Sequence, residues 1–323
     1  MQRRISEQWW VTLPMLLFLA APAIAAEFPA WAFPGCPVKS VGAAPDAGEP
    51  RSVPGSDQRF SAASIRIRSQ VHDWFPGEHA PPPSVVTRNR ADDQYACGYC
   101  HLPDGAGRPE NAKIAGLPAA YIIAQVKALR GHERRPSLAD WPPTSLMVAS
   151  TRDLTDEDLE SVANYFSAQK VRSFVHVVEQ PESPPHDTAC FIYAPTSTGT
   201  KEPATTIVEM PADMSRFELR DPHVPYDAFV PPGSVERGRA LAEAGRDLTQ
   251  PCSACHGPGL RGDATLPGPP LAGRFPTYLF RQLYAIQSGT RGGTAVQPML
   301  PVVAHLSLSD MVDLAAYAAS LPP

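Results

Sequence analysis

A five-residue pattern of two cysteines and a histidine occurs twice in this chain of 323 residues. The first copy is Cys97-Gly-Tyr-Cys-His101, and the second is Cys252-Ser-Ala-Cys-His256. Residues three and four apart lie on one face of a helical turn, so each copy brings two thiols and an imidazole together. Four of the six cysteines belong to these motifs. The chain is therefore expected to build two sites of the same composition.

C-x-x-C-H is the attachment motif of c-type haem, in which the thiols form thioethers and the histidine approaches the iron. A zinc site is an alternative, but it needs four ligands brought together. A redox C-x-x-C pair of the thioredoxin type would need a surrounding βαβ pattern, which the sequence lacks. We interpret the motifs as two haem c attachment sites, formed by Cys97, Cys100 and His101, and by Cys252, Cys255 and His256.

The two halves are also similar downstream of the motifs. Residues 114–125 (IAGLPAAYIIAQ) align with residues 271–282 (LAGRFPTYLFRQ). Further on, residues 147–168 align with residues 299–320, and both segments begin with Met. The period is too long for a solenoid repeat, so the pattern indicates a duplicated domain.

Apolar residues at helical spacing predict a helix from Leu154 to Phe166, with Thr155 and Asp158 as a capping box. In the second half we expect helices over 234–245, 276–289 and 307–320. Each half is thus predicted to be a small all-α module.

The first residues have the layout of a secretory signal peptide: Arg3 and Arg4, an apolar run, and small residues near Ala25. We expect cleavage after residue 25 or 26. An uncleaved membrane anchor is the alternative, although Pro14 and Pro22 interrupt the short apolar stretch. No later segment is long and apolar enough to span a bilayer. The formal net charge of −5 does not indicate a nucleic-acid partner.

On the two C-x-x-C-H motifs, the Tyr-led helices and the Met before each final helix, the chain resembles tandem class I cytochromes c of the dihaem c4 group. The resemblance implies a mainly α fold with two class I cytochrome c domains and two covalently bound haem c groups. The expected divisions are a signal peptide (1–26), a Pro-rich extension packing on the first haem domain (27–90), the first cytochrome c domain (91–170), an acidic insertion (171–230) and the second cytochrome c domain (231–323).

A methionine sulfur as sixth iron ligand raises the reduction potential and excludes small molecules. Met299 follows Pro298 and precedes the last helix, so it is the candidate in the second domain. Met147 holds the same place in the first domain but lacks the preceding proline. His132 and His176 are the alternatives to Met147, whereas His305, close to Met299, is expected at the surface.

The family's proline carbonyl, which accepts the proximal-histidine N–H, maps onto Pro270. The aligned residue of the first domain is Lys113, a departure that puts the tuning of the first haem in doubt. Tyr121 and Tyr278, at the start of the middle helices, are expected to contact the cofactor.

The insertion 171–230 carries 4 basic and 9 acidic residues, so it is a possible docking face or simply a solvated segment. Its runs SFVHVV, ACFIYA and TTIVEM suggest short β-strands in an irregular connection. Cys36 and Cys190 remain outside the motifs and are expected to form a disulfide between the extension and the insertion. The alternative is that one of them is an unusual axial haem ligand.

Three functions fit this sequence. The first is a periplasmic dihaem electron carrier between a dehydrogenase or quinol-oxidising complex and an oxidase or another cytochrome. The second is a dihaem redox enzyme, peroxidase-like or thiosulfate-oxidising, with an exchangeable or unusual ligand at the first haem. The third is an electron-accepting subunit of a dehydrogenase complex. The two candidate methionines favour the carrier or the subunit over the enzyme.

Overall fold

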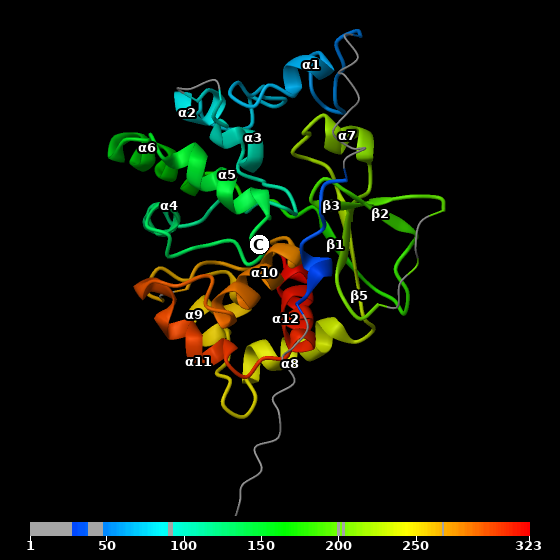
Figure 1. Cartoon of the computed structure of the whole chain (residues 1–323), viewed down its shortest axis with the longest axis vertical. Coiled ribbons are helices and arrows are strands. Elements are labelled where there is room, and N and C mark those ends of the chain that lie inside the picture. The colour runs from blue at the N-terminus through cyan, green and yellow to red at the C-terminus, as the bar shows by residue number, and fades with distance from the viewer. Residues whose placement is uncertain (1–27, 38–47, 90–92, 199–200, 202–203, 267) are drawn as a thin grey trace, which may run out of the picture.

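The computed structural model describes residues 28–37, 48–89, 93–198, 201, 204–266 and 268–323. The expected signal peptide lies outside these residues. Figure 1 shows two groups of helices, one above the other, with a small β-sheet along one side of both. We call them the first module (residues 93–170) and the second module (residues 231–323).

The first module consists of α3 (Cys97–His101), α4 (Ala119–Arg130), α5 (Pro142–Thr151) and α6 (Asp156–Ser167). α6 begins with the expected capping box: the Thr155 side chain accepts from the Asp158 N–H, and the Asp158 carboxylate accepts from the Thr155 N–H. α4 and α6 pack around Ile122 and Phe166. Two short helices precede them, α1 (Ala62–Ile65) and α2 (Ser84–Thr87), and α2 contacts α3 and α6.

The second module has its own hydrophobic core around Phe280 and Met311. Ser307 and Asp310 form a capping box at the start of its last helix, as Thr155 and Asp158 do in the first module. Its opening helix crosses the last helix at Gly238. Its elements are α8 (Ser234–Ala244), α9 (Ser253–His256), η3 (Pro258–Leu260), α10 (Pro276–Gln287), η4 (Thr294–Met299), α11 (Leu300–Val303) and α12 (Leu308–Ser320).

The insertion forms a three-stranded sheet and a hairpin. The sheet has the order β1 (Val175–Glu179), β5 (Tyr226–Val230) and β4 (Val208–Pro211), with β1 parallel and β4 antiparallel to β5. α7 (Met214–Glu218) lies between β4 and β5 in the chain. The hairpin pairs β2 (His186–Ala189) with β3 (Ile192–Pro195).

The run ACFIYA was expected to be a single strand, and this expectation is wrong. The backbone reverses at Cys190 and Phe191, which both have positive φ (41° and 74°), so the run supplies the end of β2, the turn and most of β3. A two-residue turn with two positive φ values suits the twist of a hairpin. The sheet packs on the second module, where Val175 and Tyr226 meet Phe275 and Ala319.

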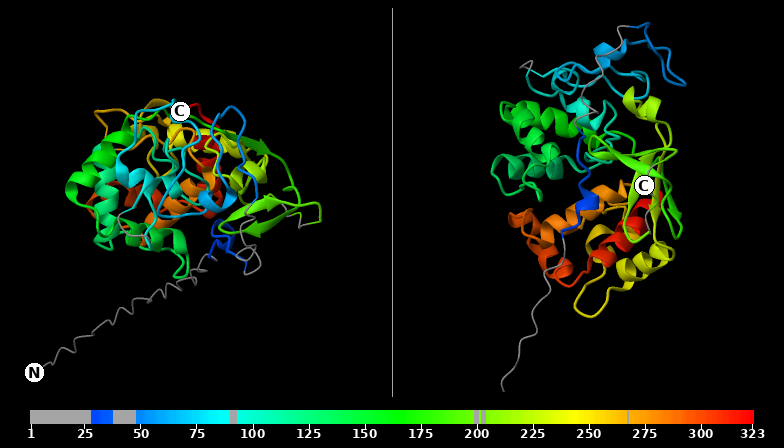
Figure 2. Two further views of the ribbon diagram at one scale, coloured as in Figure 1. Left: turned by 90° about the horizontal axis from the view of Figure 1, so that it is seen from above. Right: turned by 45° about the vertical axis from the view of Figure 1, so that its right-hand side comes forward.

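The N-terminal extension was expected to pack on the first module, but part of it contacts the second module instead. Its first described part, with η1 (Ala30–Ala32), lies against the second module: the rings of Trp31 and Phe280 are 4.4 Å apart, and Arg281 donates to the Ala32 carbonyl at 3.0 Å. A disulfide joins Cys36 to Cys190 in the hairpin. Figure 2 shows this segment running beside both modules.

Among the described residues no single helix is long and apolar enough to cross a membrane. One pair, Thr294–Val303 with Leu308–Ser320, meets the length and composition criteria only if it is joined across a bend of 114°.

Candidate functional site

The two C-x-x-C-H motifs adopt the same local structure. Each lies in a short helix, α3 or α9, and the residue after the histidine has positive φ: Leu102 at 62° and Gly257 at 76°. The chain then turns back, so that the Gly107 N–H donates to the His101 carbonyl at 2.9 Å. The equivalent bond from Gly262 to His256 measures 2.8 Å. The two copies of the motif therefore share their backbone hydrogen bonds as well as their sequence.

A backbone carbonyl orients each histidine ring. His101 Nδ1 lies 2.8 Å from the Ala112 oxygen, and His256 Nδ1 lies 2.7 Å from the Pro269 oxygen. A carbonyl only accepts, so Nδ1 carries the proton and Nε2 keeps its lone pair. Burial lowers the pKa of both histidines, which favours the neutral, ligating form.

The expectation that the Pro270 carbonyl holds the second histidine is wrong by one residue. The acceptor is Pro269, and the Pro270 carbonyl instead accepts from the Arg274 Nε at 2.6 Å. In the first module the acceptor is likewise Ala112 rather than the aligned Lys113. Two consecutive prolines precede Leu271, and residue type alone does not tell which of their carbonyls faces the ring.

The cysteine thiols lie in apolar surroundings. Burial raises the pKa of Cys97 to about 12 and the pKa of Cys100 and Cys252 to about 11. Within the described part of the chain, no three His, Cys, Asp or Glu side chains are arranged to hold a metal ion.

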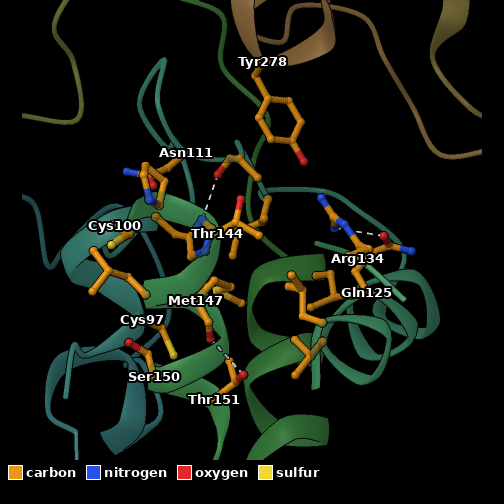
Figure 3. A pocket seen from close by; sticks show the side chains of 18 of the residues that line it. Cys97, Cys100, Asn111, Gln125, Arg134, Thr144, Met147, Ser150, Thr151 and Tyr278 are labelled. Carbon is orange, nitrogen blue, oxygen red and sulfur yellow. Dashed lines mark hydrogen bonds between the residues drawn. The ribbon is translucent and has the colours of Figure 1, made fainter. Parts of the chain in front are cut away.

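A cavity opens beside α3 in the first module. Cys97, Cys100, His101 and Met147 all line it, together with apolar residues of α4, α5 and α6. Figure 3 shows Met147 on α5 near the two cysteines, and Tyr278 projecting toward the cavity from the second module. Residues of both modules therefore line the cavity, and Met147 lines it together with residues of the C-x-x-C-H motif.

The alternative histidine ligands lie elsewhere. His132, His176 and His305 are exposed, and none of them lines this cavity. Met299 ends η4, is partly buried and packs against the core of the second module, directly after Pro298.

Three residues of each module form a polar array between the modules, of which only the two tyrosines were expected to be functional residues from the sequence. Tyr121, Gln125 and Arg134 each stand 157 residues before Tyr278, Gln282 and Arg291. An antiparallel bridge pairs Arg134 with Arg291. The constant offset was a readable signal, but only the tyrosines and glutamines fell within the aligned segments.

The hydrogen bonds of the array cross between the modules. Arg134 donates to Gln125 Oε1 (3.0 Å) and Gln282 Oε1 (2.9 Å). Arg291 donates to the same two oxygens (both 3.0 Å) and to the Tyr121 hydroxyl (2.9 Å). Every acceptor in the array is neutral. Burial by itself raises the pKa of Tyr121, but the guanidiniums of Arg291, Arg134 and Arg274 together outweigh burial and lower the pKa. The array therefore has an excess of buried positive charge.

The chain matches known proteins over most of its length. The cytochrome c family model matches residues 235–322. Cytochrome c4 of Azotobacter vinelandii is 37% identical over 227 residues, which cover 68% of this chain and 82% of that protein. The chain belongs to the cytochrome c4 family. Cytochrome c4 of Pseudomonas aeruginosa is 26% identical over 228 residues, covering 68% and 81%. A solved thiosulfate dehydrogenase of Marichromatium purpuratum has a TM-score of 0.46 and 27% identity, covering 71% of this chain and 37% of that one.

Members of the cytochrome c4 family are dihaem class I cytochromes c, and membership implies covalently bound haem c and electron transfer with redox partners. The array fits such a cofactor, because haem carries carboxylate groups that a buried pair of guanidiniums would neutralise. Arg291 lines the cavity, and its buried Nε has no hydrogen-bond partner among the described residues. Arg134 lines the same cavity.

Proposed function

We propose that this chain carries two haem c groups and passes single electrons between periplasmic redox proteins. The observation that carries the proposal is the cavity of the first module, where Met147 lines the same space as Cys97, Cys100 and His101. A closed His/Met site exchanges electrons without binding substrate. Met299 would supply the sixth ligand in the second module, with His256 as the fifth.

Haem iron supplies the redox chemistry, and the residues of the chain keep each site rigid. Ala112 and Pro269 hold the two imidazoles through Nδ1–H···O bonds, which orients the rings and raises their basicity. Apolar side chains such as Phe166 and Val162 exclude water from the first cavity. Fixed ligands and a dry pocket limit the rearrangement that accompanies gain or loss of an electron.

For partners, we propose a dehydrogenase or a quinol-oxidising complex as electron donor and an oxidase or another cytochrome as acceptor. The N-terminal pattern of residues 1–26 supports export to the periplasm. The acidic insertion offers a surface for a basic partner.

The test is ligand binding to the reduced protein. A pyridine haemochrome assay should give two haem c groups per chain, and carbon monoxide should bind neither haem rapidly. Fast, stoichiometric binding of carbon monoxide at one haem would reject the closed carrier and support the dihaem enzyme. A haem content of one per chain would reject the proposal that both modules carry haem.

A further inference from the structure

Two buried side chains break the symmetry of the repeated loops. Lys113 stands where the second module has Pro270, and Arg274 stands where the first module has Leu117. The two residues are 3% and 4% exposed. They hold each other's loops: the Arg274 guanidinium donates to the Lys113 carbonyl, and the Lys113 ammonium donates to the Gly273 carbonyl at 2.8 Å. Lys113, which replaces the proline of the second module, thus links the two modules.

This contact lies next to both histidine acceptors. Lys113 follows Ala112, whose carbonyl accepts from His101, and Pro270 follows Pro269, whose carbonyl accepts from His256. Arg274 donates to the Lys113 carbonyl through Nη1 and to the Pro270 carbonyl through Nε. One guanidinium therefore binds the peptide units immediately after the two acceptors.

A guanidinium is a planar fork with fixed donor directions, so it can fix two carbonyls relative to each other. The hydrogen bond to a ligating histidine sets ring orientation and ligand basicity, and these affect the reduction potential. We propose that Arg274 is a positioning residue that orients both proximal histidines, so that one side chain tunes the reduction potentials of both haems. This proposal rests on the proposed function, in which His101 and His256 bind haem iron.

The direct test is Arg274→Lys in the full-length holoprotein. Lysine keeps a nitrogen donor but loses the planar fork, so the loops loosen and both His–carbonyl bonds weaken. Less basic histidines stabilise ferric iron less, and both potentials should rise. We expect a change of up to about tenfold in each reduction equilibrium, or about 59 mV for one electron. Potentiometric titration measures both haems.

Arg261→Lys is the matched control, because the Arg261 side chain is exposed and bonds the Pro322 carbonyl rather than the peptide units next to the two histidine acceptors. Its potentials should equal those of the wild type. A shift of one haem alone in Arg274→Lys, or of neither, would overturn the proposal. A variant or wild type with fewer than two haems by pyridine haemochrome would point instead to failed assembly or to a wrong proposed function.

Lys113→Met is a second test that leaves the Lys113 carbonyl available to Arg274. Burial and the Arg274 guanidinium lower the pKa of Lys113 to about 7. The carboxylates of Asp104 and Glu209 act in the opposite direction, but their effect is smaller. At about pH 9 the side chain is therefore neutral, and the substitution removes the bonds of Nζ without changing charge. Both potentials should rise, but less than in Arg274→Lys. Unchanged potentials at this pH would count against the shared role.

Discussion

The two modules share the structure of their C-x-x-C-H loops but complete their cores in different ways. In the second module the long helix α8 crosses α12 so closely that a Cβ on Gly238 would lie 2.0 Å from the Asp313 oxygen. Beside the first module, the four-residue helix α2 of the preceding segment lies against α3, where a Cβ on Gly98 would lie 2.8 Å from the Val86 oxygen. The cavity of the first module is then lined by distant residues, among them Phe33 and Tyr278.

The difference indicates that the first site depends on its surroundings. Tyr278, Arg281 and Arg291 of the second module contact the first cavity, and Trp141 brings the N-terminal Phe33 to the same wall, with ring centroids 5.5 Å apart. Separating the modules would open this wall to water. The pair is therefore better described as one unit with two haem loops than as two independent domains.

The largest expected effect is the loss of a sixth ligand. Met147→Ala and Met299→Ala should each abolish the Met–iron charge-transfer band of one haem, leaving about half of the wild-type intensity, and should lower that haem's potential. Optical spectroscopy of the oxidised protein measures both. Leu146→Ala is the control for α5, because Leu146 lines the same cavity without a ligating atom. An unchanged spectrum in Met147→Ala would show that its assignment as a ligand is wrong.

Gly238→Ala tests the helix crossing that distinguishes the second module. The added methyl group has no room against the Asp313 carbonyl, so α8 must move away from α12. We expect a loss of about 3 kcal/mol in the free energy of unfolding, at the upper end of overpacking costs. Arg239→Ala, on the exposed side of α8, should cost much less, because it removes only surface ion pairs. Urea unfolding compares the two, and equal losses would contradict the close crossing.

Glu209→Gln tests the ionisation of the buried carboxyl that bonds β4 of the sheet to α10. Glu209 is 2% exposed and accepts from the Thr277 N–H at 3.2 Å. Burial raises its pKa from 4.5 to about 7, while the unfolded chain ionises at the ordinary value. Stability from this group is therefore full below pH 4.5 and falls as the pH rises to about 7.

The loss across this range amounts to roughly 3 kcal/mol for a shift of this size. Glutamine should remove it, so Glu209→Gln should be more stable than the wild type at neutral pH and about equal to it at acidic pH. Chemical denaturation at the two pH values measures this. Glu160→Gln, at an exposed site on α6, is the control. A variant with the wild-type pH profile would rule out the shifted carboxyl.

Local patterns could be predicted from the sequence, and contacts between distant segments could not. The C-x-x-C-H motifs, the capping box at Thr155, and the order of Met and final helix depend on neighbours in the chain. The Arg134–Arg291 array and the Lys113–Arg274 contact depend on how two modules meet, which no local periodicity encodes. The turn at Cys190 and Phe191 contains no Gly or Asn, so residue type gave no sign of positive φ.

The smallest effect tests whether the modules unfold together. Thr155→Ala and Ser307→Ala each remove the side-chain oxygen of an equivalent capping box and should each cost about 1 kcal/mol. Thr155→Ser and Ser307→Thr keep that oxygen and should cost little. If the buried bonds between the modules make them one cooperative unit, either alanine variant should lower the single unfolding transition seen at both haems. If each variant lowered the transition at one haem only, the modules would unfold independently, and the first site would not depend on the second module.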